Sequence, residues 1–197
     1  MDESKRNAII KTIIMMVFAA MVVLGIFVIL TRSGNKTNDT TEDVELTEVQ
    51  KITTMDLSKS YPKTPSTVAD LYVRIMKVMY KQDYTDEEFN QMADVMAGIF
   101  DSEFLAIQNN WPQGLKSEVD AKKKDDYSIS KYEVLSSDLQ ATTDAGEEIA
   151  NVLAKISLRH GTSTVLYDYL FVLRKDADDN WKIMGWTVSE DPDNKKQ

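Results

Sequence analysis

Hydrophobic residues are most concentrated near the start of the chain, where residues 13–30 carry no charged, amide or hydroxyl side chain. As an α-helix this run would be about 27 Å long, close to the roughly 30 Å hydrocarbon core of a bilayer. Backbone groups find no water in that core, so a single spanning segment has to be helical. The pattern predicts a transmembrane helix over residues 12–31, with the lipid bilayer as its partner.

A cleaved signal peptide and a buried core helix are the alternatives for this run. A signal peptide usually has a shorter apolar region, of about 7–15 residues, followed by small residues at its cleavage site. Leu30 is instead followed by Thr31, Arg32 and Ser33. A soluble helix of this length usually keeps one polar face. We therefore expect an uncleaved anchor, which is not a lipoprotein anchor because the chain has no cysteine.

Lysine and arginine residues flank the predicted span unevenly. Lys5, Arg6 and Lys11 precede it, whereas Arg32 and Lys36 follow it. Cytoplasmic flanks carry the excess of positive charge in most membrane proteins, and the first helix usually sets the orientation. We expect a single-pass protein of the cell membrane with a cytoplasmic N-terminal tail, residues 1–11, and an extracytoplasmic C-terminal domain.

Residues 32–63 are rich in Thr, Asp, Glu, Asn and Lys and hold few large apolar side chains. Such a composition buries too little apolar surface to fold by itself, so we expect a solvated polar tether. Four scattered apolar residues leave open a short helical or docking segment; they are Val44, Leu46, Val49 and Ile52. We place the folded domain at residues 64–190 and a polar tail at residues 191–197.

Helical periodicity begins after Thr64 and Pro65, where a hydroxyl cap and a proline are typical of a helix start. The apolar residues of a predicted helix over 66–82 recur at helical spacing; they are Val68, Leu71, Tyr72, Ile75, Val78 and Met79. Thr85 and Glu88 form a capping-box pattern for a second helix that reaches Phe100. A third, short helix is expected over 102–107, whereas the polar residues 113–126 are expected to be a solvated helix face or a loop.

From Tyr127 onward the hydrophobic period changes to two, which predicts strands over residues 127–140, 148–160, 162–175 and 181–188. Short turns that contain Gly, Asp or Asn separate these runs, so neighbouring strands should pair antiparallel. Helices followed by strands indicate an α+β fold, with about three helices packed on one face of a curved antiparallel sheet of about four strands.

This order of elements, with Trp181-Lys182-Ile183 and Trp186 in the last strand, resembles the nuclear-transport-factor-2-like superfamily. Residues 61–65 (YPKTP) and 174–183 are similar to a family of uncharacterised bacterial single-span membrane proteins. The resemblance covers residues 61–190 and implies a cone-shaped domain whose sheet wraps around the first helix and has room for a pocket. It implies no single function, because this fold hosts enzymes, binding modules and assembly factors.

Charge and cysteine content argue against several classes of function. The chain carries 23 Lys and Arg residues against 32 Asp and Glu residues, a formal net charge of −9. Nucleic-acid binding needs a positive surface, so no nucleic-acid partner is expected. With no cysteine and a single histidine, His160, the chain offers no thiolate chemistry and no ordinary zinc site. We expect no metal and no cofactor.

Asp168 is the candidate catalytic residue. It lies between Tyr167 and Tyr169 in the middle of a predicted strand, where a charge is disfavoured. In an apolar pocket its pKa would be raised, which suits a general base. The alternative is that Asp168 faces solvent or pairs with Lys155 or Arg159. A buried and unpaired Asp168 that faces a cavity would support catalysis, and an exposed or ion-paired Asp168 would end that hypothesis.

Aromatic residues are the candidates for lining a ligand pocket, although aromatic residues at such spacing usually form core. The pocket candidates are Tyr72, Tyr132, Asp168 and Trp186. Tyr80 and Trp181 are further aromatic residues of the same kind.

Three functions fit these patterns. The first is a membrane-anchored extracytoplasmic module that binds an unidentified small molecule or protein without catalysis. The second is a structural subunit of a cell-envelope assembly, similar to the scaffold components of secretion and conjugation systems. The third is a small-molecule isomerase or dehydratase that uses Asp168 as a pocket carboxylate.

The predicted topology can be tested by adding protease to spheroplasts and following the C-terminal domain by immunoblot. We expect the domain to be digested, because a span over 12–31 places it outside the cytoplasm. A cytoplasmic protein that must stay intact serves as the control, and full protection of the domain would reverse the topology.

Overall fold

The computed structural model describes residues 46–108, 110–135, 139–143 and 146–191, all within one unit that spans Leu46–Gln197. The predicted cytoplasmic tail 1–11, the predicted transmembrane helix 12–31 and the first part of the predicted tether lie outside these residues. Inside them, no helix is both long and apolar enough to cross a membrane.

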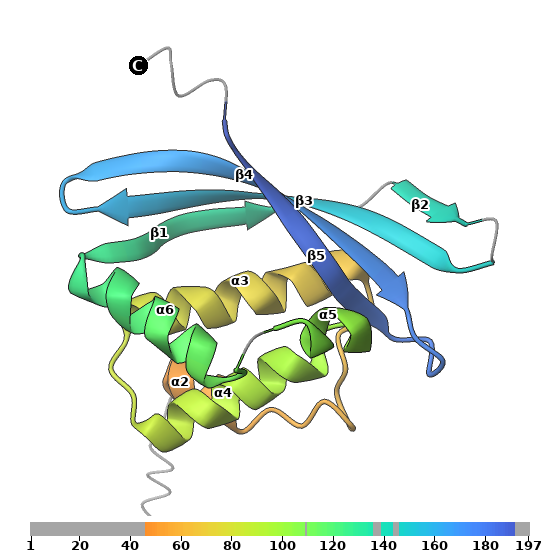
Figure 1. Ribbon diagram of the computed structural model, residues 1–197, viewed down its shortest axis with the longest axis horizontal. Helices are drawn as coiled ribbons and strands as arrows, with labels where there is room; N and C mark the ends of the chain where they lie inside the picture. Colours follow the sequence, from red (N-terminus) through yellow and green to blue (C-terminus); the bar gives the residue numbers. More distant parts are fainter. Residues whose placement is uncertain (1–45, 109, 136–138, 144–145, 192–197) are drawn as a thin grey trace, which may run out of the picture. The chain divides into compact units, whose positions relative to one another are not determined.

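Five helices precede five strands in the described part of the chain (Figure 1). The helices are α2 (Glu48–Thr53), α3 (Pro65–Lys81), α4 (Asp86–Gly98), α5 (Ser102–Ala106) and α6 (Gln113–Lys124). The strands are β1 (Tyr127–Val134), β2 (Leu139–Thr142), β3 (Glu148–His160), β4 (Ser163–Lys175) and β5 (Trp181–Glu190).

All five strands belong to one antiparallel sheet in the order β1-β3-β4-β5, with β2 also paired to β3. β1 pairs with residues 154–160 of β3, and β2 pairs with residues 148–151 of the same strand. The run 127–140, predicted as one strand, is therefore two short strands that share one edge of β3. Helices packed on an antiparallel sheet confirm the predicted α+β class.

The alternation along β3 and β4 turns one set of side chains toward the helices. Ala150 lies opposite Leu173, and Val152 lies opposite Phe171, and all four side chains are buried. Because successive residues of a strand point to opposite faces, these cross-strand pairs mark the inner face of the sheet.

Helix α3 lies against this inner face and contacts β1, β3 and β5, with α4 and α6 packed on its other sides (Figure 1). The Thr64 hydroxyl accepts a hydrogen bond from the Thr67 backbone amide, and Pro65 occupies the first turn, as predicted. Most α3 side chains are buried. The buried set is Pro65, Val68, Ala69, Leu71, Tyr72, Val73, Ile75, Met76, Val78 and Met79.

The second half of the predicted tether is part of the folded unit, which corrects the expected start at residue 64. Thr47 and Gln50 form a capping box at the start of α2. Val49 and Ile52 are buried in the core, and Arg74 of α3 contacts the Glu48 carboxylate at 2.8 Å. Two apolar residues three apart are enough to dock one helical turn, so the short docking segment left open above is the observed arrangement.

Residues 113–124 form the regular helix α6, so of the two predicted alternatives, a solvated helix face or a loop, the helix is observed. Val119 is its buried residue, and lysines fill its last turn. Positive charge is favourable at a helix C-terminus, which helps a helix that buries little apolar surface.

An ion pair joins the start of α5 to the sheet. One Asp101 oxygen accepts a hydrogen bond from the Glu103 backbone amide, and the other contacts Arg174 Nη2 at 2.8 Å. The Asp101 side chain is only 8% exposed, so this contact is shielded from water. The neighbouring Phe100 forms a parallel bridge with Ile183, which ties this segment to the edge strand β5.

Candidate functional site

An inner cavity lies between the sheet, α3 and α6, and consists of two lobes. Four residues line both lobes: Tyr72 and Met76 of α3, Glu118 of α6 and Trp186 of β5.

The first lobe has a volume of about 150 Å³ and lies between α3, α4 and the start of α6. Its further lining residues are Met96, Phe100, Gln108, Trp111, Gly114 and Leu115. An apolar cavity of about 150 Å³ is large enough to bind benzene, so this lobe has room for one six-membered ring.

The second lobe has a volume of about 200 Å³ and lies against the inner face of the sheet. Its further lining residues are Val73, Tyr80, Lys122, Ile129, Ile156, Leu158 and Tyr169. Apolar and aromatic walls with a few polar groups are typical of small-molecule sites.

Ring contacts fix the wall that the two lobes share. The Tyr72 ring centroid lies 4.8 Å from that of Trp186 and 5.3 Å from that of Phe171. Phe104 of α5 packs edge-on against Trp186 at 5.4 Å. Tilted and edge-on ring pairs of this kind are favourable beyond the area they bury, so Trp186 has a defined position.

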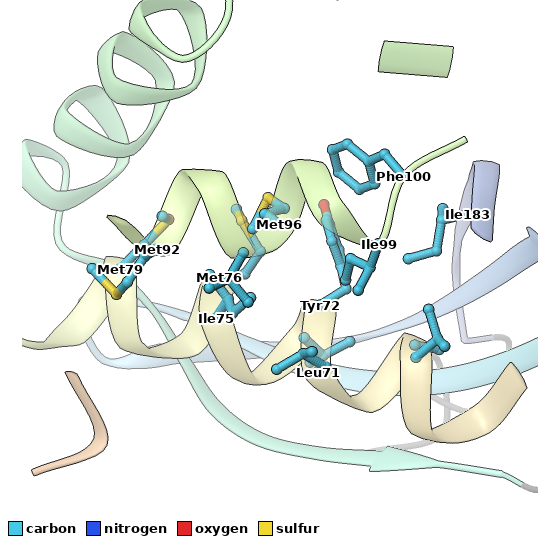
Figure 2. Close-up of a cluster of buried hydrophobic side chains, with 14 of the residues drawn as sticks. Leu71, Tyr72, Ile75, Met76, Met79, Met92, Met96, Ile99, Phe100 and Ile183 are labelled. Carbon is cyan, nitrogen blue, oxygen red and sulfur yellow. The ribbon is translucent and has the colours of Figure 1, made fainter. Parts of the chain in front are cut away.

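Tyr72 has a buried ring and a hydroxyl that no described residue binds. Tyr72 is 6% exposed, and its hydroxyl makes no hydrogen bond to any residue of the described part of the chain. Figure 2 shows this hydroxyl pointing away from α3, toward Met96 and Phe100 of the first lobe. In the lining of the same lobe, Trp111 Nε1 is buried without a hydrogen-bond partner among the described residues. Burying such a donor without a partner is costly, which makes it a group that a ligand can satisfy.

Burial raises the pKa of Tyr72 well above its usual value, and the charges of Tyr169, Tyr80 and Glu118 raise it further. Burial also raises the pKa values of Tyr80 and Tyr169, and Glu118 contributes to both. All three phenols are therefore neutral at pH 7 and can donate or accept a hydrogen bond.

Glu118 lies at the rim, where both lobes meet. It is exposed on α6, and its charge contributes to the raised pKa values of Tyr72, Tyr80 and Tyr169. Lys122, which also lines the second lobe, holds its ammonium group over the Tyr127 ring at 4.4 Å from the centroid. The rim thus carries one acceptor that faces the aromatic interior.

Two of the four predicted pocket residues, Tyr72 and Trp186, line the inner cavity. Tyr132 lies outside its lining, with the Lys77 ammonium 5.4 Å from its ring centroid. Burial and the neighbouring Asp70 raise the pKa of Tyr132 to about 12. Tyr132 therefore packs α3 against β1 and does not contribute to this site.

Asp168 is paired, which ends the hypothesis that it acts as a pocket base. It lies directly opposite Lys155 in the sheet, and Lys155 Nζ contacts its carboxylate at 3.1 Å. The same ammonium group also contacts Asp191, at the end of β5. Neither lobe of the inner cavity is lined by Asp168. This carboxylate therefore has the alternative role given above, a cross-strand ion pair.

Sequence reasoning missed the contribution of α6 to the site. Leu115, Glu118 and Lys122 all line the cavity, and they recur at intervals of three and four residues. That spacing marks one face of a helix and was the available signal. The polar composition of residues 113–126 concealed it.

His160, the one histidine, stacks on Tyr127 with a centroid distance of 4.3 Å and an interplanar angle of 7°. It is exposed and lies outside the lining of both lobes. Among the described residues, no group of His, Asp and Glu side chains is arranged to hold a metal ion.

Over residues 1–186 the chain matches the protein family described as domain of unknown function (DUF6715). Curated proteins gave no match. The matched stretch includes the predicted transmembrane helix 12–31 and every residue of the inner cavity.

The enclosure of Tyr72 predicts a specific loss of stability in alkali. Above about pH 10 the unfolded chain releases the tyrosine proton and the folded chain does not, so the free energy of unfolding falls by about 1.4 kcal/mol per pH unit for each such tyrosine. Tyr72→Phe removes one such residue, and its free energy of unfolding should fall less steeply by about that amount.

Urea unfolding of both proteins at pH 8 and at several values between about 10 and 11 measures these slopes. Below about pH 10 the two proteins should respond to pH in the same way, because both keep a neutral side chain at this position. Equal slopes above pH 10 would show that Tyr72 ionises in the folded protein as it does in the unfolded chain.

Proposed function

We propose that this chain, which belongs to the DUF6715 family, is a membrane-anchored extracytoplasmic module that binds a small molecule in its inner cavity without catalysing a reaction. The observation that carries the proposal is the Trp111 indole N–H in the lining of the first lobe, which is buried and has no hydrogen-bond partner in the described part of the chain. A bound ligand would supply the missing hydrogen bond and fill space that the side chains leave open.

Binding requires fewer functional groups in this cavity than catalysis does. A binding site needs a shaped cavity with apolar walls and polar groups that fix orientation, and both lobes have aromatic and polar residues in their lining. The isomerase or dehydratase alternative relied on Asp168, and that carboxylate is paired with Lys155. We therefore assign the site to recognition.

The proposed fold is nuclear-transport-factor-2-like. In its favour, a helical layer precedes the strands in the described part of the chain, its longest helix α3 lies against the inner face of the sheet, and the space left beside α3 is the inner cavity. Cavities at this position fit the cone-shaped arrangement that the sequence resemblance implies.

The proposed anchor holds the domain close to the bilayer. The predicted span ends at residue 31, and the folded unit begins at Leu46. Even when fully extended, the linking residues 32–45 reach at most roughly 50 Å. The inner cavity would then sample the space next to the membrane.

A structural role in a cell-envelope assembly is the second candidate, and one observation favours it. On the outer face of the sheet, Leu170 is 41% exposed and lies directly opposite Leu153. Exposed apolar residues on a sheet face can mark a surface that meets another protein. This role is compatible with a ligand in the cavity on the other face.

Filling the first lobe should weaken ligand binding. Leu115 lines this lobe, so the larger side chain of Leu115→Trp occupies the space of a small ring. Benzyl alcohol is a suitable probe for the full chain in lipid nanodiscs, with binding measured by saturation-transfer NMR. We expect Leu115→Trp to weaken binding by about tenfold or more, a free-energy change of about 1.4 kcal/mol.

Ser117→Trp is the matched control, because Ser117 is exposed on the same helix and lines neither lobe. It should bind the probe as the unmodified chain does. Equal binding by all three proteins would place the probe elsewhere and contradict the proposed site.

A further inference from the structure

Glu118 has no ion-pair partner in the described part of the chain, although α6 is rich in lysine. Lys116 contacts Asp120 at 3.1 Å and Asp86 at 3.3 Å. Lys123 donates a hydrogen bond to the Gln82 backbone oxygen at 2.7 Å. The charge of Glu118 is therefore available for a ligand.

The position of Glu118 directs this charge toward the cavity. Glu118 lines both lobes, and its charge contributes to the raised pKa values of Tyr72, Tyr80 and Tyr169. A second negative charge in the same space would be repelled by Glu118. An anionic ligand is accordingly disfavoured.

The walls behind Glu118 suit a positive charge. Trp and Tyr rings attract cations to their faces, and Trp186 and Tyr72 line both lobes. Among the described residues, Lys122 is the cationic side chain in the lining, and its ammonium group is held over Tyr127. The neutral Tyr72 hydroxyl can accept a hydrogen bond from an N–H group.

We propose that the ligand of the inner cavity is an organic ammonium ion, whose charged nitrogen binds the Glu118 carboxylate and whose aromatic or compact apolar body fills a lobe beside Tyr72 and Trp186. This inference rests on the proposed function, because it names the class of ligand that the same cavity takes. The first lobe, at about 150 Å³, sets the size of the body to about one ring.

Three probes that share one ring and differ in charge test the inference: protonated benzylamine, neutral benzyl alcohol and anionic benzoate. The full chain in phosphatidylcholine nanodiscs is titrated with each probe at pH 7, and binding to empty nanodiscs is subtracted. We expect benzylammonium to bind about tenfold more tightly than benzyl alcohol, and benzoate to bind most weakly.

Glu118→Gln removes the charge and keeps the shape of the side chain. Because Glu118 is exposed and unpaired in the described structure, this variant should fold normally. Its affinity for benzylammonium should fall to that for benzyl alcohol, and its affinity for benzyl alcohol should not change. Asp120→Asn is the control, since it makes the same change of charge on α6 at a residue outside the lining.

The possible results separate the inference from the proposed function. If benzyl alcohol or benzoate binds at least as tightly as benzylammonium, and Leu115→Trp weakens that binding about tenfold or more, the cavity binds ligands but the ammonium class is wrong. If Glu118→Gln leaves the preference for benzylammonium unchanged, or Asp120→Asn removes it equally, the role of Glu118 is wrong. If no probe binds, the proposed function and the inference fail together.

Discussion

The burial of α3 between the sheet and the other helices is the interaction on which this structure depends. Ten residues of the helix are buried, and they contact β1, β3 and β5 on one side and α4 and α6 on the others. No other helix of the described chain buries as many residues. Because fully burying one large aliphatic side chain stabilises the folded state by about 1.5–3 kcal/mol, α3 contributes the largest share of this stabilisation among the described helices. Polar contacts then fix the surroundings of α3, as Arg74 does for α2 and Asp101 with Arg174 does for α5.

The inner cavity is a consequence of the same packing. Tyr72 is placed by α3, Trp186 by β5, and Phe104 of α5 supports Trp186 from behind. Because these aromatic rings are rigid and meet at steep angles, they leave gaps between the sheet and α3. Helix α6 covers the remaining side, and Val119 is its one buried residue. The other residues on its inward face therefore line the inner cavity. The inner cavity therefore lies on the side of α3 that α6 covers.

Local patterns in the sequence were sufficient for much of the fold. The spacing of apolar residues and the caps at Thr64 and Thr85 predicted α3 and α4, and the period of two predicted the long strands. The short helix α2 was expected to be solvated, because Val49 and Ile52 are isolated in polar sequence and are stabilised only by the core they reach. The division of residues 127–140 into two strands depends on their pairing with β3, and this pairing cannot be deduced from local periodicity.

The candidate site was predicted only in part, because local patterns do not show how distant elements pair and pack. Tyr72 and Trp186 stood out as aromatic residues in strong periodic patterns, and both line the cavity. Asp168 was a candidate because a charge in a strand is unusual, but only the register shows that Lys155 lies opposite to it. Glu118 lies on a polar helix, and its role depends on which face of that helix meets α3 and the sheet.

Native-state hydrogen exchange of the full chain tests most directly whether the packing of α3 holds the domain together. Amides in residues 73–79 of α3 should exchange only through global unfolding, with a free energy equal to that measured by denaturant. Amides in residues 117–122 of α6 should exchange through smaller openings with a lower free energy, because this helix buries so little. Exchange of the α3 amides at a free energy below that of the α6 amides would contradict the account.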